Sequence, residues 1–153
     1  MVIKIQRNHS LLLFFSKAEK TRIVSAIKEA EKKTSAEIRV HLEREFSGQG
    51  VEHARKMFER LGMHRTKDRN GVLILLGTRS RSFTVLGDQG IHEKVPQGFW
   101  NEIAQSMLEE FKEDRFSDGI VYAIEKIGEK LRTYFPHERD DKNELPDGIS
   151  YSL

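Results

Sequence analysis

The chain has 153 residues, of which 37% are hydrophobic and 33% are charged, and this size and composition predict one globular domain with its own core. Lys and Arg together number 26 against 24 for Asp and Glu, so the formal net charge is only +2. Such a balance excludes the strongly basic surface typical of nucleic-acid-binding proteins. Cysteine is absent, which excludes disulfide scaffolds, thiolate zinc sites and thiol catalysis.

The N-terminal segment, residues 1–15, contains a short apolar run from Leu11 to Phe15. This run is shorter than the hydrophobic region of about 7 to 15 residues in a secretion signal, and no small-residue cleavage site follows it. No stretch approaches the roughly 20 apolar residues of a membrane span. We therefore expect a soluble, cytoplasmic monomer in which residues 1–15 are a lead-in that packs against the first helix.

The first helix and the first strand have clear sequence signals. Ser16 and Glu19 have the spacing of a capping box, and apolar residues then recur at helical intervals from Ile23 up to Thr34. The following stretch "SAEIRVHLE" alternates apolar with polar residues. This period of two predicts a strand with one buried and one solvated face.

The middle of the chain predicts a helix and two more strands. A helical pattern runs from Val51 to Leu61, and after the polar turn "TKDRNG" the run "VLILLG" is typical of a strand buried on both faces. We expect it to be the central strand. The short polar stretch "TRSRS" leads into "FTVLG", which predicts a β-hairpin and an antiparallel third strand.

The last third of the chain predicts two helices and a tail. Apolar residues at helical spacing indicate one helix from Phe99 to Phe111 and another from Ile120 to Leu131, with Ser117 or Asp118 as its cap. The sequence thus predicts one α/β domain, residues 16–135, with a small mixed central sheet of about three to four strands sandwiched between helices. Residues 136–153 are interpreted as a polar C-terminal tail, extended or loosely docked.

Acidic residues from three segments are predicted to converge at one edge of the sheet. Strands one and two should be parallel, because a helix connects them, so the end of the antiparallel third strand lies beside their starts. Asp88 follows the third strand, Asp68 and Asn70 precede the second, and Glu37 opens the first. Oxygen-rich loops of this kind suit Ca²⁺ or Mg²⁺, and positive φ at residues 87 and 90 would leave room for a ligand.

Each of these residues also has a structural interpretation. Asp88 between two glycines is typical of a turn residue that hydrogen-bonds its own loop, and Asp68 before Asn70 is common turn chemistry. Glu37 fits a solvated strand face, and Asp118 fits the acidic first turn of a helix. The sequence leaves these alternatives open.

Other chemistries lack a signal. The histidines show no ligand spacing for zinc, and neither a GxSxG motif nor a phosphate-binding GxxxxGK[ST] loop is present. "GDQG" is too short for a dinucleotide fingerprint, so no organic cofactor is expected. Trp100 lies on the apolar stripe of its helix and is expected in the core, while Arg79 and Arg81 in the hairpin turn are expected to be solvated, with phosphate contact as the alternative.

The order of four motifs resembles the short cytoplasmic branch of the TPM domain family, which includes a thylakoid-lumen protein of photosystem II repair. The motifs are "KKTSAEIRVHLE", "RNGVLILLG", "FTVLGDQGIHEKV" and "FWNEIAQSMLEEFKEDRFSDGI". The similarity extends from about Phe14 to Leu131, and the tail "NELPDGISY" also resembles tails of that branch.

The resemblance implies an α/β sandwich with a small central sheet and an acidic cleft that binds divalent cations in several members. It also implies a link to acid phosphatases, without an agreed nucleophile to transfer. Matching positions include Asp68, Asn70 and Gly71, the motif of Gly87, Asp88, Gly90 and Ile91, and the helix link of Phe111, Arg115, Phe116 and Gly119. Asp118 stands where an acid is frequent. Longer, secreted members tend to have an aromatic residue in place of Asp88.

Two functions are consistent with these residues and motifs. The favoured one is a binding or assembly module with an acidic, divalent-cation-binding cleft at the sheet edge. The metal ligands would be Asp88, Asp68, Glu37 and Asp118. The partner of the module would be a protein. The alternative is a metal-assisted, acid-phosphatase-like phosphoesterase, in which a Ca²⁺ or Mg²⁺ ion would polarise a phosphorylated small molecule and activate water. No catalytic residue is identified.

Overall fold

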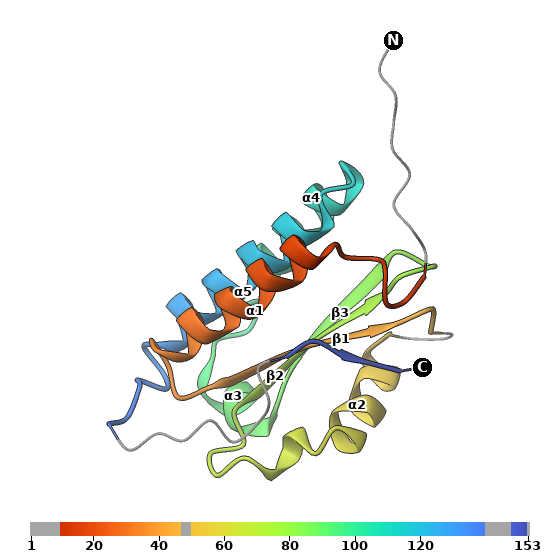
Figure 1. Ribbon diagram of the computed structural model, residues 1–153. Helices are drawn as coiled ribbons and strands as arrows, with labels where there is room; N and C mark the ends of the chain where they lie inside the picture. Colours follow the sequence, from red (N-terminus) through yellow and green to blue (C-terminus); the bar gives the residue numbers. More distant parts are fainter. Residues whose placement is uncertain (1–9, 47–49, 140–147, 153) are drawn as a thin grey trace.

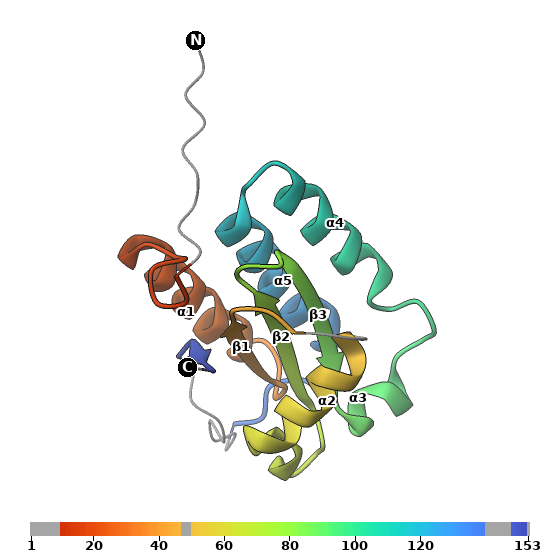
Figure 2. The same ribbon diagram turned by 90° about the vertical axis from the view of Figure 1, so that its right-hand side faces the viewer.

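The computed structural model describes residues 10–46, 50–139 and 148–152, arranged in three layers (Figure 1). In chain order the elements are α1 (Lys17–Glu31), β1 (Glu37–Glu43), α2 (Gly50–Arg60), the 3₁₀ helix η1 (Met63–Arg65), β2 (Gly71–Gly77), β3 (Ser82–Gly87), α3 (Gln89–Lys94), α4 (Asn101–Lys112), α5 (Phe116–Leu131) and β4 (Ser150–Tyr151). Helices α1, α4 and α5 cover one face of the sheet and α2 lies against the other (Figures 1 and 2). Within these ranges no helix combines the length and apolarity needed to cross a membrane.

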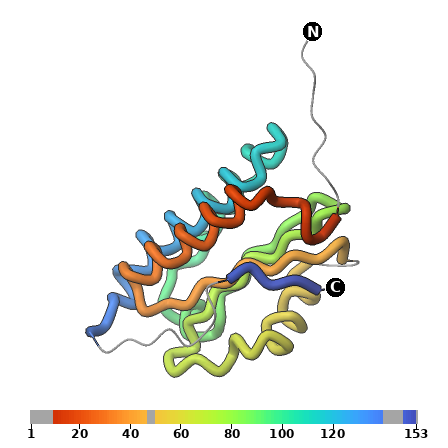
Figure 3. Tube along the Cα trace, viewed as in Figure 1, coloured from red at the N-terminus to blue at the C-terminus, as the bar shows by residue number. Residues whose placement is uncertain are grey.

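The sheet has the strand order β3-β2-β1-β4. β1 and β2 are parallel and β2 and β3 are antiparallel, so the predicted mixed sheet is confirmed. The fourth strand comes from the C-terminal segment, which pairs in parallel with β1 beside His41 and Leu42. Figure 3 shows this blue segment running along the orange β1. Part of the predicted tail, 140–147, lies outside the described residues, as do residues 1–9 of the predicted lead-in.

The main core lies between the sheet and the layer of α1, α4 and α5. Alternate residues of β1 and β2 enter it, among them Val40 and Ile74, which have no exposed surface. From the lead-in, Leu11, Phe14 and Phe15 join the same core, and the ring of Phe14 packs edge-on against Phe116 of α5. This burial explains why an apolar run precedes α1.

A smaller core lies between the sheet and α2. It contains Leu73 and Leu75 of β2 together with Met57 and Phe58 of α2 and Met63 of η1. All seven residues of β2 are buried. The interpretation of "VLILLG" as a strand buried on both faces is therefore confirmed.

The predicted solvated face of β1 is wrong. The four polar residues of this face, which we call the polar row, are each at most 7% exposed: Glu37, Arg39, His41 and Glu43. On this face α2 and η1 cover β2, and β1 beside it is bounded by His53 of α2 and by the C-terminal strand that pairs along its edge. The alternating sequence pattern is the same whether the polar face meets water or polar partners.

The starts of α1 and α5 show how far the local sequence predicts the caps of helices. The capping box of α1 is confirmed, because the Ser16 side chain accepts from the Glu19 amide and the Glu19 side chain accepts from the Ser16 amide. The cap predicted for α5 is wrong. Residues 117 and 118 already lie inside this helix, and Arg115 precedes it without a side-chain cap. The first residue of this helix, Phe116, is instead buried in the core.

Ile74→Ala should destabilise the protein by roughly 2 to 5 kcal/mol, because it opens a cavity in the middle of the central strand. Chemical denaturation of wild type and variant measures this free energy of unfolding. Leu108→Ala is the matched control, since Leu108 is 40% exposed and its truncation should cost less than about 1 kcal/mol. A cost as small for Ile74→Ala would contradict the burial of β2 on both faces.

Candidate functional site

A cleft of about 610 Å³ runs along the outer edge of β3. Residues 85–88 form its floor. One wall comes from α2, with Val51 and Arg55, and the other from α3 and the residue before α4, with His92 and Trp100. Trp100, expected in the core, packs against the core while one part of it faces this cleft.

Asp88 lies in the floor of the cleft and is held by a two-pronged ion pair. Nε of Arg69 donates to one carboxylate oxygen at 2.8 Å and Nη2 donates to the other at 2.9 Å. The Asp88 carboxylate also accepts from the Gln89 amide at 2.7 Å, which caps α3. Hydrogen bonding to Asp88 raises the pKa of Arg69 above its ordinary value. The loop-bonding interpretation of Asp88 thus describes its contacts in the structure.

The two glycines that flank Asp88 are needed for close packing. A Cβ on Gly90 would lie 2.1 Å from the Asp68 carbonyl oxygen, and one on Gly87 would lie 2.8 Å from the Trp100 ring. The predicted positive φ at both positions is wrong, because the described glycines with positive φ are Gly62 and Gly98. Arg69 itself has a φ of 50°, which turns the chain so that its side chain meets Asp88.

The structure brings the backbones of the predicted acids together, as expected from the topology. Glu37 pairs with Gly71 of β2, and the Asp88 amide donates to the Gly71 carbonyl. The space over Gly71 on this face is filled, because a Cβ there would lie 3.2 Å from both the Met63 carbonyl oxygen and the Phe58 ring. Packing atoms of the second core therefore lie between the Glu37 and Asp88 positions.

The other predicted residues are not part of the cleft lining. Asp68 is exposed and Asn70 is buried, where its amide group donates to Ser35 at 3.2 Å. Asp118 is on α5 and pairs with Arg22 of α1 at 2.9 Å. Across the described part of the chain, no three His, Asp or Glu side chains are grouped so that they could hold a metal ion.

The charges of the cleft have both signs. Arg55 and Arg69 face it together with Glu59 and Asp88, and the imidazole rings of His64 and His92 also line it. Arg69 is neutralised by Asp88, whereas Arg55 is exposed and makes no ion pair with any described residue. Val51 is also 46% exposed. The α2 wall thus presents a cation and an apolar side chain to the cleft.

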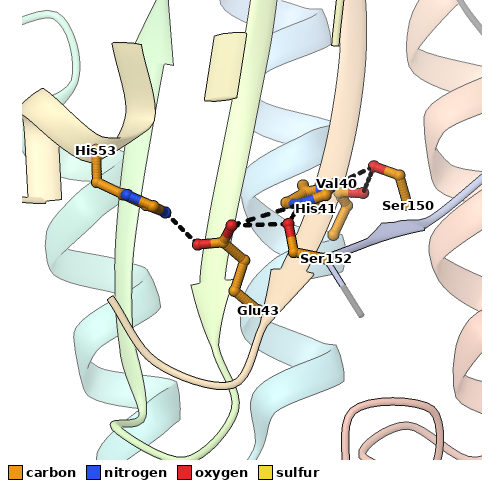
Figure 4. A network of polar contacts seen from close by, with 6 residues as sticks. All are labelled: Val40, His41, Glu43, His53, Ser150 and Ser152. Carbon is orange, nitrogen blue, oxygen red and sulfur yellow. Dashed lines mark hydrogen bonds and ion pairs between the residues drawn. The ribbon is translucent and has the colours of Figure 1, made fainter. Parts of the chain in front are cut away.

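A second polar cluster ties the C-terminal strand to the polar row (Figure 4). Nδ1 of His41 contacts the Ser150 hydroxyl and Nε2 contacts the Ser152 hydroxyl, each at 2.7 Å. Ser152 also donates to Glu43 at 2.8 Å, and the other Glu43 oxygen is bonded to His53 of α2. This cluster joins β1, β4 and α2, and none of its residues lines the cleft.

The cluster has the residue types of a hydrolase site without its accessibility. His41 is only 2% exposed, and both of its nitrogens are engaged by serines of the tail. Burial lowers the pKa of His41, and the Arg39 charge lowers it further against an opposing contribution from Glu43. We therefore assign the cluster a structural role, which is to hold β4 on β1.

Comparison with protein families identifies the chain. The family model TPM_phosphatase, described as the TPM domain, matches residues 13–130. The chain belongs to the TPM domain family. Comparison with curated proteins gave no significant match.

Solved structures resemble this TPM domain over most of its length. The BA42 protein from the psychrophilic bacterium Bizionia argentinensis has 41% sequence identity and a TM-score of 0.86, with 91% of this chain and 96% of that chain covered. The N-terminal domain of the cg2496 protein from Corynebacterium glutamicum has 12% identity and a TM-score of 0.61, with 88% and 79% covered. The N-terminal domain of a P. gingivalis protein has 18% identity and a TM-score of 0.67, with 87% and 85% covered. The last two share the fold.

Sequence reasoning about this TPM domain missed Arg55, Arg69 and the polar row. The signal for Arg69 was weak, because an arginine in a polar turn is usually solvated. The signal for the polar row was stronger. A strand with the pattern of burial on both faces requires its parallel neighbour to be covered on both faces too.

The stability of this TPM domain should fall as the pH drops below about 6.5, the ordinary pKa of histidine. Because the pKa of His41 is lowered in the folded state, the unfolded chain takes up a proton first, and the stabilisation present above that pH is lost. Arg39, Glu43 and His53 are the charged and titratable groups around it. Urea unfolding between pH 7.5 and 5.0 measures the slope.

The His41→Gln variant separates this effect from other titrating groups. It should show a shallower loss of stability over the same pH range, because its position 41 takes up no proton. A slope equal to that of the wild type would contradict a neutral, buried His41. Ser106→Ala, on the outer surface of α4, is a control that should leave the slope unchanged.

Proposed function

We propose that this TPM domain acts as a binding module and that the cleft at the edge of β3 is its recognition site. The observation that supports this is the composition of the cleft. Its α2 wall carries Arg55, which has no ion-pair partner among the described residues, next to the exposed Val51. Trp100 on the opposite wall offers a large, rigid contact surface. Such a mixture of apolar and charged groups suits recognition of another molecule.

The side chains around the cleft favour binding over turnover. Among the residues that the structure describes, its lining includes no serine, threonine or tyrosine that could act as a nucleophile. Asp88 has both carboxylate oxygens engaged by Arg69 and by the α3 amide. A nucleophile is expected to lie within hydrogen-bond reach of a base that a third group orients, and Asp88 has instead the environment of a structural residue.

A divalent cation is part of this proposal as a modulator of the cleft. Asp88 is the carboxylate in the cleft floor, Asp68 precedes Arg69 in the adjoining turn, and carbonyl oxygens of that turn lie beside Gly90. Ca²⁺ or Mg²⁺ would have to displace the Arg69 guanidinium from Asp88. Competition with this resident cation, and ligands drawn from loops, predict a weak dissociation constant of order 10⁻⁴ to 10⁻³ M.

Ca²⁺ or Mg²⁺ should therefore raise the melting temperature of the wild type relative to chelator. At a free ion concentration about 100 times the dissociation constant, the gain is about 2.7 kcal/mol. Thermal unfolding with about 10 to 100 mM ion, which is about 100 times the expected dissociation constant, or with chelator measures the shift. Arg69→Gln should enlarge the ion-dependent shift, because it frees the Asp88 carboxylate, whereas Asp88→Asn should abolish it.

Ion-dependent shifts, and not absolute melting temperatures, are the quantities to compare, because both variants lose the ion pair between residues 69 and 88. Asp118→Asn is the control, since Asp118 pairs with Arg22 outside the cleft, and its shift should equal that of the wild type. If the melting temperature of the wild type did not change with the ion, the cation would not be part of the proposed function. If Asp88→Asn showed the same ion-dependent shift as the wild type, the cation would bind outside the cleft.

Phosphoester hydrolysis is the second candidate, and the grouping of Arg55, Arg69 and His92 around the cleft favours it. Guanidinium groups bind phosphoryl oxygens in a two-pronged way, and an ion at Asp88 could activate water. Turnover of p-nitrophenyl phosphate by highly purified protein, abolished by Asp88→Ala, would establish this function. If the protein showed no turnover but still bound ligands in the cleft, the binding module would remain the proposed function.

A further inference from the structure

β3 is one of the two outer strands of the sheet, and no other described strand pairs with its outer edge. At the other side of the sheet, β4 covers part of β1. Open edges attract other strands, and proteins usually protect them with charged residues, proline or bulges. The sequence of β3, SFTVLG, contains no charge and no proline, and its register with β2 is unbroken from Ser82 to Gly87.

The backbone groups of β3 alternate between β2 and the cleft side. The Asp88 amide donates to the Gly71 carbonyl, and residues 88 and 71 continue the antiparallel register. Hydrogen-bonded pairs alternate along such a ladder, so the amides and carbonyls of Phe83, Val85 and Gly87 point away from β2. No hydrogen bond to another described residue engages these outward groups.

The cleft encloses the C-terminal half of this edge. Its floor includes residues 85–87, its α2 wall lies on the side of Leu86, and Trp100 lies on the side of Gly87. An extended segment that pairs with β3 would lie between these two walls. The same sheet already accepts such a segment at β1, where Ser150 and Tyr151 pair with His41 and Leu42.

We propose that the cleft is a strand-addition site, in which an extended segment of a partner protein pairs with β3 as a further strand of the sheet. This rests on the proposed function, since it names the kind of partner that the binding module takes. Main-chain hydrogen bonds to residues 83, 85 and 87 provide the pairing, and alternate side chains of the segment provide selectivity.

The walls define the chemistry of the partner segment. Side chains on its α2 side meet Arg55, which has no ion-pair partner among the described residues, and an acidic residue there gains a charge-assisted hydrogen bond. Side chains on the other side meet Trp100 and His92, where an apolar residue is favoured. The partner segment therefore alternates between the two sides over about five positions, with an acidic residue opposite Arg55, away from Glu59 on the same wall, and an apolar residue on the Trp100 side. It has no proline in its centre.

Selection of linear heptapeptides from a displayed library against the full chain tests the proposal. Selected peptides should show the acidic and apolar alternation. In NMR experiments, binding should slow hydrogen exchange at the amides of Phe83, Val85 and Gly87 by tenfold or more. A selected peptide that is N-methylated at every second residue should lose binding in one register and retain it in the other, because only alternate peptide amides face β3.

Protein variants complete the test. Arg55→Glu should weaken binding of acidic peptides tenfold or more, whereas Lys56→Glu, the next residue on α2 and outside the cleft lining, should not. Peptides that bind in the cleft with equal affinity in both N-methylated forms would overturn strand addition and leave the binding module intact. If no selected peptide bound in the cleft, both strand addition and the binding module would be overturned. A dimer in sedimentation, together with slowed exchange of the Phe83, Val85 and Gly87 amides in that dimer, would make a second copy the occupant and overturn the partner proposed here.

Discussion

The burial of β2 on both faces is the constraint on which the rest of the structure depends. Seven consecutive residues without a charged or polar side chain cannot meet water on either side, so helices must close over both faces of the sheet. The layer of α1, α4 and α5 covers one face, and α2 with η1 covers the other. This cover extends to β1, whose polar row becomes buried as a consequence.

Burial of the polar row explains the C-terminal strand. A buried histidine and a buried carboxylate require hydrogen-bond partners, because an unsatisfied polar group in the interior costs about 1 to 3 kcal/mol. Ser150 and Ser152 supply these partners to His41 and Glu43, and His53 supplies one from α2. The tail is thus fixed to one edge of the sheet, and β3 is left at the other.

The corner at Asp88 fixes the shape of the cleft. The ion pair with Arg69 holds the turn before β2 against the start of α3, and Gly90 allows the backbone of that turn to approach. These contacts place Trp100 and α3 opposite α2, with the edge of β3 between them. Asp88, which the sequence analysis assigned to a cation site, therefore helps to build the cleft. The recognition surface that we propose comes from the edge strand and its two walls.

Local and periodic signals in the sequence were sufficient for much of the fold. The capping box at Ser16, the doubly buried run of β2 and the antiparallel return of β3 are each determined by neighbours in the chain or by a single hydrophobic pattern. The polar row, the docking of β4 and the ion pair of Arg69 depend on partners 10 to 111 residues away. No local pattern specifies such partners, so the topology of the site was predictable whereas the charges that face it were not.

The central claim is that β3 presents an open edge inside the cleft. Hydrogen exchange of the β3 amides in the free protein tests this claim most directly. We expect a strict alternation measurable by NMR: the amides of Thr84 and Leu86 exchange slowly, and those of Phe83, Val85 and Gly87 exchange at least about tenfold faster, because they lack a partner on the cleft side. Uniformly slow exchange at all five amides would contradict the claim, since the outward groups of β3 would then already be paired.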